Sequence, residues 1–183
     1  MKSYNDSTFE EVRDYLKSLR KTDAKFKIYF AGPWFTKKSN EVMMHCIDVA
    51  KDCARYVDVY FPRAHTANKP SKTFDDNIKA IQDCDILVAF ISEKDSGTAF
   101  EIGYAKALGK QVVLLCYNED DFKSTTNIML AFAAEAVIPM SDLSLFLTDD
   151  IYTGEQIHIS DDWEHNWQWG VKWNLIMVLK ISK

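Results

Sequence analysis

Two carboxylates lie six residues apart in the segment DSGTAFE, residues 95–101. Asp95 follows a short apolar run, Asp85–Ile91, that predicts a buried strand, and Glu101 falls within helical periodicity over Thr98–Leu108. Both carboxylates would then lie at the carboxyl end of a strand, where α/β sheets usually bind ligands. A carboxylate in the first turn of a helix tends to stay ionised, as a nucleophile must. We therefore interpret this segment as the best candidate for an active site.

Glu101 also has a purely structural interpretation. Thr98 and Glu101 have the spacing of a capping box, in which each side chain binds the other residue's backbone N–H at the start of a helix. Spacing by itself leaves the capping role and the catalytic role open. Gly109 and Lys110 mark the expected end of the same helix.

Aromatic residues follow the first predicted strand, in the sequence IYFAGPWFT at residues 28–36. Gly32 and Pro33 are expected to turn the chain and leave Trp34 and Phe35 at the mouth of a cleft. Flat rings there can stack on a flat ligand such as a nucleobase. If strands one and three are neighbours, Trp34 faces both carboxylates across one pocket. Alternatively, the two rings only fill the end of the sheet.

Composition narrows the class of protein. At 183 residues, with 47% hydrophobic and 13% aromatic residues, the chain is long enough for one well-filled domain and too short for two ordinary ones. The net charge is −5 and the 22 basic residues are scattered, which argues against nucleic acid or a membrane surface as the main partner. A small neutral ligand is favoured instead.

Cysteine and histidine spacing predicts no metal site and no cofactor. The four cysteines form no CxxC pair and are interpreted as reduced core thiols of an intracellular protein. The four histidines lack metal-ligand spacing, and the acidic group Asp161, Asp162, Glu164 and His165 is interpreted as a solvated turn. No signal peptide or membrane-spanning run is found, so we expect a cytoplasmic protein.

Apolar runs alternate with amphipathic ones along the chain. The apolar runs predict strands at Phe26–Ala31, Val57–Phe61, Asp85–Ile91, Gln111–Cys116 and Ala136–Ile138. The amphipathic runs predict helices at Ser39–Arg55, Phe74–Asp83, Thr98–Leu108 and Thr125–Ala134. This alternation indicates an α/β fold with a doubly wound parallel sheet of five strands, in the order 2-1-3-4-5, and helices on both faces.

The two ends of the chain lie outside this alternation. Phe9–Leu19 predicts an amphipathic N-terminal helix. The C-terminal extension is rich in tryptophan, with a stripe formed by Trp163, Trp167, Trp169 and Trp173. Such a stripe indicates core or subunit interface rather than a cofactor site.

Taken together, these residues resemble the nucleoside 2-deoxyribosyltransferase family. The resemblance covers about residues 27–141 and rests mainly on the specific block DSGTAFEIGYA at residues 95–105. Supporting matches are IYFAGPWFT at 28–36, Asn77 with Ile81 and Asp85, Gly109-Lys110, and Asn127 with Met129. The family implies a flavodoxin-like fold in one domain, residues 1–183, with a family-like core at 26–141 and extensions at 1–25 and 142–183.

The resemblance also implies roles for single residues. In the family, the glutamate matching Glu101 is the nucleophile, the aspartate matching Asp95 hydrogen-bonds the nucleobase, and the tyrosine matching Tyr29 helps to position the nucleophile. These three are the expected catalytic residues. The expected substrate-binding residues are Gly32, Trp34, Phe35, Asn77, Gly97, Asn127 and Met129. The segment of Asn127 and Met129 reaches a neighbouring subunit's site in the family, which implies a homo-oligomer.

The implied reaction exchanges the nucleobase of a 2′-deoxyribonucleoside through a covalent deoxyribosyl-glutamate, with retained configuration. The departing base needs a proton or a strong hydrogen bond, and Asp95 is the first candidate donor. Some members use an aspartate at the position of Asn77 for proton transfer, which asparagine cannot perform. Asp75 and Asp76 are candidate substitutes, or else caps at a helix start.

Two other functions stay open. Related hydrolases use the same fold and glutamate to cleave 2′-deoxynucleoside 5′-monophosphates, and hold the phosphate in the loop after the first strand. Lys37 and Lys38 near that loop suit a phosphate, although exposed lysines at a helix start are usually only solvated. The third function is a catalytically silent nucleotide-binding domain, in which ligand binding would not depend on Glu101.

Overall fold

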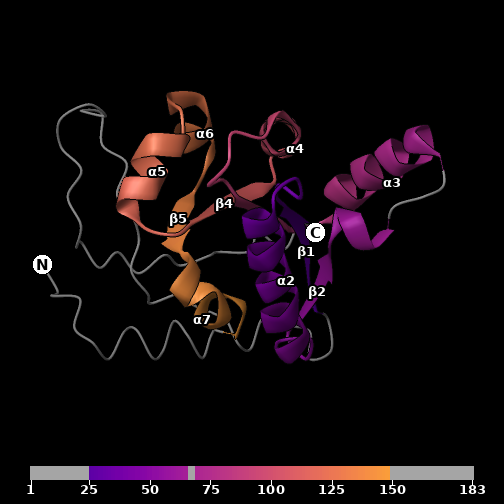
Figure 1. The fold of residues 1–183 in the computed structure, drawn as a ribbon. Coiled ribbons are helices and arrows are strands. Elements are labelled where there is room, and N and C mark those ends of the chain that lie inside the picture. Colours follow the sequence, from indigo (N-terminus) through magenta and orange to yellow (C-terminus); the bar gives the residue numbers. More distant parts are fainter. Residues whose placement is uncertain (1–24, 66–68, 149–183) are drawn as a thin grey trace, which may run out of the picture.

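The structure, a computed structural model, describes residues 25–65 and 69–148 (Figure 1). The strands are β1 (Phe26–Ala31), β2 (Val57–Tyr60), β3 (Ile86–Phe90), β4 (Gln111–Cys116) and β5 (Ala136–Pro139). The α-helices are α2 (Lys37–Asp52), α3 (Pro70–Asp83), α4 (Ser96–Ala107), α5 (Glu119–Thr125), α6 (Ile128–Ala133) and α7 (Leu143–Thr148). Two short 3-10 helices, η1 (Pro62–His65) and η2 (Met140–Asp142), follow β2 and β5.

The five strands run parallel in the order β2-β1-β3-β4-β5, which confirms the predicted doubly wound sheet. All residues of β3 are buried, as expected for a strand covered on both faces. The direction of winding reverses between β1 and β3. The loops that follow these two strands therefore flank the crevice where such sheets bind ligands.

Helices cover both faces of the sheet (Figure 1). Alternate side chains of each strand point to opposite sides, so apolar residues of one strand are buried on both faces. Ile28 and Phe30 of β1 belong to a core that includes residues of α2 and α7. Tyr29 and Ala31 of the same strand belong to a second core with residues of α3, α4, α5 and α6. Tyr29 thus faces the side of the sheet on which α3 and α4 lie.

Three helices begin earlier than the sequence predicted, because their first residues include polar caps and a proline. Thr36 forms a reciprocal capping box with Ser39 at the start of α2. Pro70 occupies the first turn of α3, where its missing N–H carries no penalty. Asp95 caps α4. The apolar periodicity that predicted these helices starts only after such residues.

The helix predicted at residues 125–134 is shorter in the structure, where α6 covers Ile128–Ala133, and the preceding helix α5 was not predicted. Asn127 separates α5 from α6, and its side-chain oxygen accepts a hydrogen bond of 3.1 Å from the backbone N–H of Leu130. An asparagine that binds the backbone in this way starts a new helix rather than continuing the old one. The short helix α7 was not predicted.

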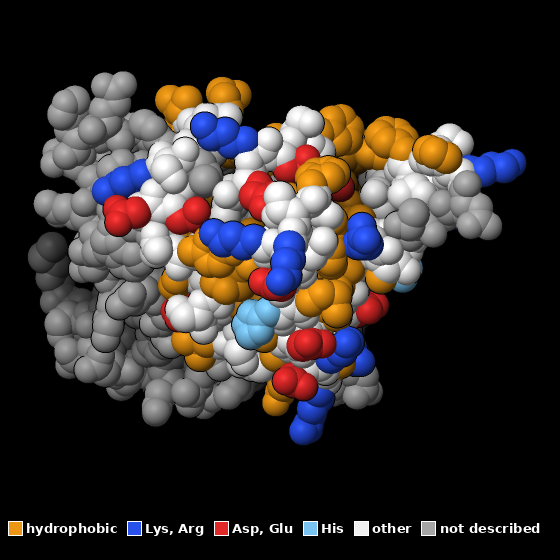
Figure 2. All heavy atoms as spheres, viewed as in Figure 1, with side chains coloured by type: hydrophobic (Ala, Val, Ile, Leu, Met, Phe, Trp, Pro, Cys, Tyr) orange, Lys and Arg blue, Asp and Glu red, His pale blue; other side chains and the backbone are white. Residues whose placement is uncertain are grey.

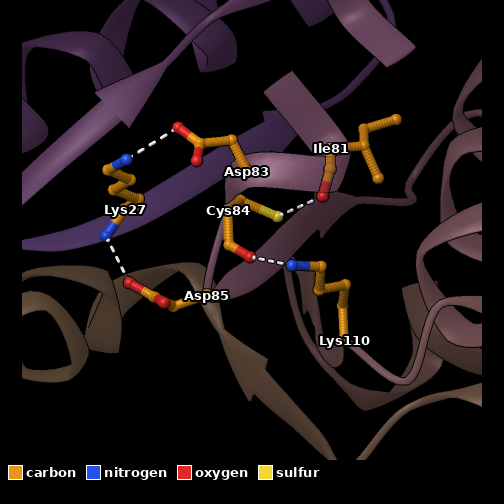
Figure 3. Close-up of polar contacts among 6 residues, drawn as sticks. All are labelled: Lys27, Ile81, Asp83, Cys84, Asp85 and Lys110. Atoms are coloured by element: carbon orange, nitrogen blue, oxygen red, sulfur yellow. Dashed lines mark hydrogen bonds and ion pairs between the residues drawn. The ribbon is translucent and has the colours of Figure 1, made fainter. Parts of the chain in front are cut away.

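A network of polar contacts joins the amino ends of three strands (Figure 3). The Lys27 ammonium lies 2.7 Å from Asp83 Oδ2, and the Lys27 backbone N–H donates to Asp85 Oδ2 at 2.9 Å. The Lys110 ammonium donates to the backbone carbonyl of Cys84 at 2.7 Å. These contacts tie β1, the connection from α3 to β3, and the start of β4 together. They lie at the edge of the sheet opposite to the carboxyl ends of the strands, where sheets of this kind usually bind ligands.

Within the described residues, no helix is both long and apolar enough to cross a membrane, and no cluster of three or more His, Cys, Asp or Glu side chains is arranged to hold a metal ion. The four cysteines are buried free thiols. The predicted helix at residues 9–19, the acidic group around His165 and the tryptophan-rich stripe lie outside the described residues.

Candidate active site

Tyr29 and Glu101 form the centre of the candidate site. Tyr29 lies on β1 and is fully buried, and its hydroxyl donates a hydrogen bond of 2.6 Å to Glu101 Oε1. Glu101 comes from α4, which contacts β1 on the same face of the sheet. A hydrogen bond to a charged acceptor is among the stronger ones, and this one holds the carboxylate in one orientation.

Glu101 lies in the second turn of α4, not in the first turn as the sequence predicted. The helix begins at Ser96, with Asp95 as its N-cap residue, so Glu101 is the sixth helical residue. The unpaired N–H groups of a helix belong to its first turn. The helix dipole therefore does not keep Glu101 ionised, and its environment in the core decides its charge instead.

Burial raises the pKa of Glu101 to about 7, well above its ordinary value of 4.5. Loss of solvation is the largest cause, the hydrogen bond from Tyr29 acts in the opposite direction, and the negative charge of Asp95 raises the pKa further. Burial and the nearby Glu101 also raise the pKa of Tyr29, so its phenol stays protonated and remains a donor. Glu101 therefore changes between neutral acid and carboxylate close to neutral pH.

Asp95 caps α4 with both carboxylate oxygens. Oδ1 accepts from the Gly97 N–H at 3.1 Å, and Oδ2 accepts from the Thr98 N–H at 2.7 Å and from the Thr98 hydroxyl at 2.6 Å. The alternative capping box of Thr98 and Glu101 is therefore wrong, because Thr98 is already inside the helix and donates to Asp95. The cap fixes where α4 leaves the loop, and so where Glu101 meets Tyr29.

A cavity of about 330 Å³ lies beside Asp95. It is lined by Asp95 and Thr98 at the start of α4 and, among others, by Ser124, Thr126 and Asn127 from the α5–α6 connection. Glu101 is not among the lining residues, because it faces β1 instead. The two carboxylates thus have different surroundings, although the charge of Asp95 still acts on Glu101.

The loop after β1 turns toward α2. A Cβ atom at Gly32 would lie 2.5 Å from Met43 Sδ, so a larger residue there would displace the methionine. Trp34 packs against the core that includes α2, and the Arg63 guanidinium lies 5.4 Å from its ring. Phe35 is 79% exposed. Trp34 thus packs partly against the core on the α2 side of the sheet, and it does not line the cavity at Asp95, so the predicted shared pocket is not formed by that cavity.

Asn77 is linked to Glu101 through two tyrosines. The Tyr60 hydroxyl donates a hydrogen bond of 3.1 Å to Asn77 Oδ1, and the Tyr60 ring stacks on Tyr29 with 5.5 Å between ring centroids. The His65 ring also stacks on Tyr60, with 4.3 Å between ring centroids. Tyr60 and His65 were missed in the sequence. Tyr60 can be identified from the register of β1 and β2, because it is the register partner of Tyr29.

Neither acidic neighbour of Asn77 caps a helix. Because α3 begins at Pro70, Asp75 and Asp76 lie beyond its first turn, and the interpretation as helix-start caps is wrong. Asp76 forms an ion pair with Lys72, and Asp75 is exposed.

The other expected substrate-binding residues lie at the start of α4 and on α6. Gly97 is exposed in the first turn of α4, and its N–H donates to Asp95. Asn127 caps α6 and lines the cavity beside Asp95, whereas Met129 is 78% exposed on α6. Within one chain, these two residues lie on the α6 side of α4, and Glu101 faces β1.

Comparisons with known proteins bear on the family of this chain. The family model described as nucleoside 2-deoxyribosyltransferase matches residues 28–158. A nucleoside deoxyribosyltransferase of Lactobacillus leichmannii is 26% identical over 138 residues, which cover 65% of this chain and 87% of that protein.

Two solved structures share the fold. A 2-deoxyribosyltransferase of Bacillus psychrosaccharolyticus has a TM-score of 0.55 at 22% identity, over 69% of this chain and 97% of that chain. A conserved protein of Enterococcus faecalis V583 has a TM-score of 0.57 at 24% identity, over 68% of this chain and 98% of that chain. Since the family model spans well over half of the chain, this protein belongs to the nucleoside 2-deoxyribosyltransferase family of glycosyltransferases.

Proposed function

We propose that this protein exchanges the nucleobase of 2′-deoxyribonucleosides, with Glu101 as the nucleophile. The observation that carries the proposal is the partly buried hydrogen bond of 2.6 Å between Tyr29 and Glu101. A nucleophilic carboxylate must be held in one orientation toward the anomeric carbon, and this contact suits that need. Family membership supports the substrate class, a 2′-deoxynucleoside with a free nucleobase as acceptor.

The proposed reaction consists of two displacements. A carboxylate oxygen of Glu101 forms a bond to the anomeric carbon of deoxyribose while the C–N glycosidic bond breaks, and the bonding electron pair leaves with the base. An acceptor base then attacks the same carbon and releases the carboxylate. Each displacement inverts the configuration, so the product keeps the configuration of the substrate.

Asp95 is proposed to contact the nucleobase as a hydrogen-bond acceptor. A carboxylate has about four acceptor positions, and the cap of α4 uses three. The position that is left suits an N–H group of the base. These contacts favour an acceptor over the proton donor that the sequence first suggested. The departing base therefore needs a donor from elsewhere in the site.

Tyr29→Phe is expected to move the pH dependence of exchange to higher pH. Only the carboxylate form of Glu101 attacks, so kcat/KM rises with pH through the Glu101 pKa of about 7. The hydrogen bond from Tyr29 lowers that pKa, and its loss lets the pKa rise. Near pH 6 the variant should be about tenfold slower than wild type. Initial rates between about pH 5 and 9 measure the effect, and an unchanged midpoint would contradict this role of Tyr29.

The alternative hydrolase function depends on a phosphate site near Lys37 and Lys38. In the structure, Lys37 lies 3.7 Å from the Glu41 carboxylate, and the Lys38 ammonium lies 4.5 Å from the centroid of the Tyr117 ring. Both lysines thus have partners on the surface around α2. We therefore favour a nucleoside without a phosphate.

Chromatography of 2′-deoxyinosine incubated with adenine and the full-length protein tests the proposed function. Appearance of 2′-deoxyadenosine would establish base exchange. Hypoxanthine and free deoxyribose without exchange would indicate a hydrolase, and the 5′-monophosphate would then be the substrate to try. Nucleoside binding that survives Glu101→Ala, with no turnover in either assay, would indicate a silent binding domain.

We also propose a homo-oligomer in which α6 of one subunit completes the site of another. Three large apolar side chains of α6 are exposed, Ile128 at 56%, Met129 at 78% and Phe132 at 47%. Figure 2 shows hydrophobic side chains along the upper margin of the molecule, over α6 and α3. Clusters of exposed apolar side chains usually mark an interface.

Met129→Asp is expected to shift the protein toward monomers and to lower exchange activity at least about tenfold, because a charge inside an apolar interface is costly. Light scattering over a range of protein concentrations, with activity measured on the same samples, checks both effects. Leu145→Asp on α7 is the matched control, since that leucine is also exposed, at 38%. A wild-type protein that is monomeric and fully active at every concentration would overturn the proposal.

A further inference from the structure

Tyr60 occupies a central place beside the catalytic pair. It ends β2, its register partner on β1 is Tyr29, and the two rings stack on the same face of the sheet. His65 of η1 also stacks on the Tyr60 ring, with nearly parallel planes 10° apart. Tyr60 therefore holds Tyr29 from the side while Glu101 accepts the hydrogen bond from the Tyr29 hydroxyl.

The Tyr60 hydroxyl also sets the orientation of Asn77. Burial is the main cause that raises the pKa of Tyr60, and the negative charges of Asp76 and Glu101 add to it, so the phenol stays protonated. The phenol proton is donated to Asn77 Oδ1 at 3.1 Å. With its oxygen engaged, Asn77 has its two N–H bonds left, and they have no other partner within the described part of the chain.

We propose that Tyr60 is a positioning residue, which orients Asn77 as a hydrogen-bond donor to the departing nucleobase and holds Tyr29 against Glu101. This inference rests on the proposed function. Asn77 transfers no proton. It stabilises the electron pair that the base carries away from the broken C–N bond, and the base then takes its proton from water. The site thus selects bases that present a ring nitrogen or carbonyl oxygen as acceptor to Asn77.

Two substitutions separate the two contacts of Tyr60. Tyr60→Phe keeps the ring stack and removes the hydroxyl, and it is expected to lower kcat/KM for exchange about tenfold without moving the midpoint of the pH profile. Asn77→Ala should cost about as much, and adding Tyr60→Phe to it should cost nothing further, because both changes remove the same contact. If the loss of kcat/KM in the double variant equalled the product of the two single losses, the proposal would be overturned. Tyr60→Leu, which also loses the stack, should shift the pH midpoint.

The orientation of Asn77 has a readout that needs no turnover. In ¹⁵N-labelled full-length protein, the side-chain amide signals of Asn77 are identified by their absence in Asn77→Ala. Tyr60→Phe should shift these signals, whereas the control Tyr56→Phe, outside the site, should not. Unmoved Asn77 signals in Tyr60→Phe would overturn the proposal. If the wild-type protein had no exchange activity and Tyr60→Phe still shifted the Asn77 signals, the result would count against the proposed function alone.

Discussion

Glu101→Ala is expected to lower the rate of base exchange by about 10⁴-fold or more, as removal of a nucleophile usually does. Glu101→Gln should lose about as much, although glutamine keeps the size of the side chain and can accept the hydrogen bond from Tyr29. A neutral amide does not form the deoxyribosyl ester on which both displacements depend. Steady-state rates with 2′-deoxyinosine and adenine measure the loss. Mass spectrometry after rapid quenching should detect a deoxyribosyl adduct in wild type alone.

Glu41→Gln is the matched control for this experiment. Glu41 is an exposed carboxylate on α2 that pairs with Lys37, so the same chemical change there should leave the rate unchanged. If Glu101→Gln kept more than a few per cent of the activity, another group would have to be the nucleophile.

Above neutral pH, Glu101→Gln is expected to have a free energy of unfolding about 3 kcal/mol higher than wild type. The pKa of Glu101 is about 7 in the folded protein, against an ordinary value of 4.5. The folded state therefore holds this proton more tightly than the unfolded state, and wild-type stability falls as the pH rises between these two values. At higher pH the folded protein carries the full cost of a desolvated carboxylate, which a neutral glutamine avoids.

Urea unfolding at about pH 5 and pH 8.5 checks this prediction. The gain from Glu101→Gln should grow from less than about 1 kcal/mol at the lower pH to about 3 kcal/mol at the higher one. Glu41→Gln should show no such growth. A gain that is equal at both pH values would mean that the Glu101 pKa is not raised in the folded state. The same substitution would thus remove activity and add stability, as expected where a functional site is kept at a cost to the fold.

The sheet could be predicted from the sequence because each strand is a short apolar run. For β1 and β4 the predicted bounds, Phe26–Ala31 and Gln111–Cys116, are those of the structure. Helix starts were harder, because caps such as Thr36 and Asp95 are polar and carry no periodicity. The start of α6 was predicted too early, at Thr125, because the helix begins only after Asn127, whose side chain caps it.

In the candidate site, too, some features could be predicted from the sequence and others could not. Glu101 and Asp95 stood out by their spacing, and the family resemblance added Tyr29, which the structure joins to Glu101. The environment of Glu101 could not be predicted, because a raised pKa comes from burial by residues distant in the chain. Tyr60 and His65 enter only when the register of β1 and β2 is known.

The polar network at the amino ends of the strands bears on how new specificities can arise in this enzyme. Lys27, Asp83 and Lys110 join the amino ends of the strands, on the side of the sheet remote from the candidate site. The loops that follow β1, β2 and β3 take no part in these contacts, so substitutions in those loops leave the contacts in place. Laboratory evolution toward other nucleobases can therefore vary the loops at the carboxyl ends of the strands, while the contacts at the amino ends are kept.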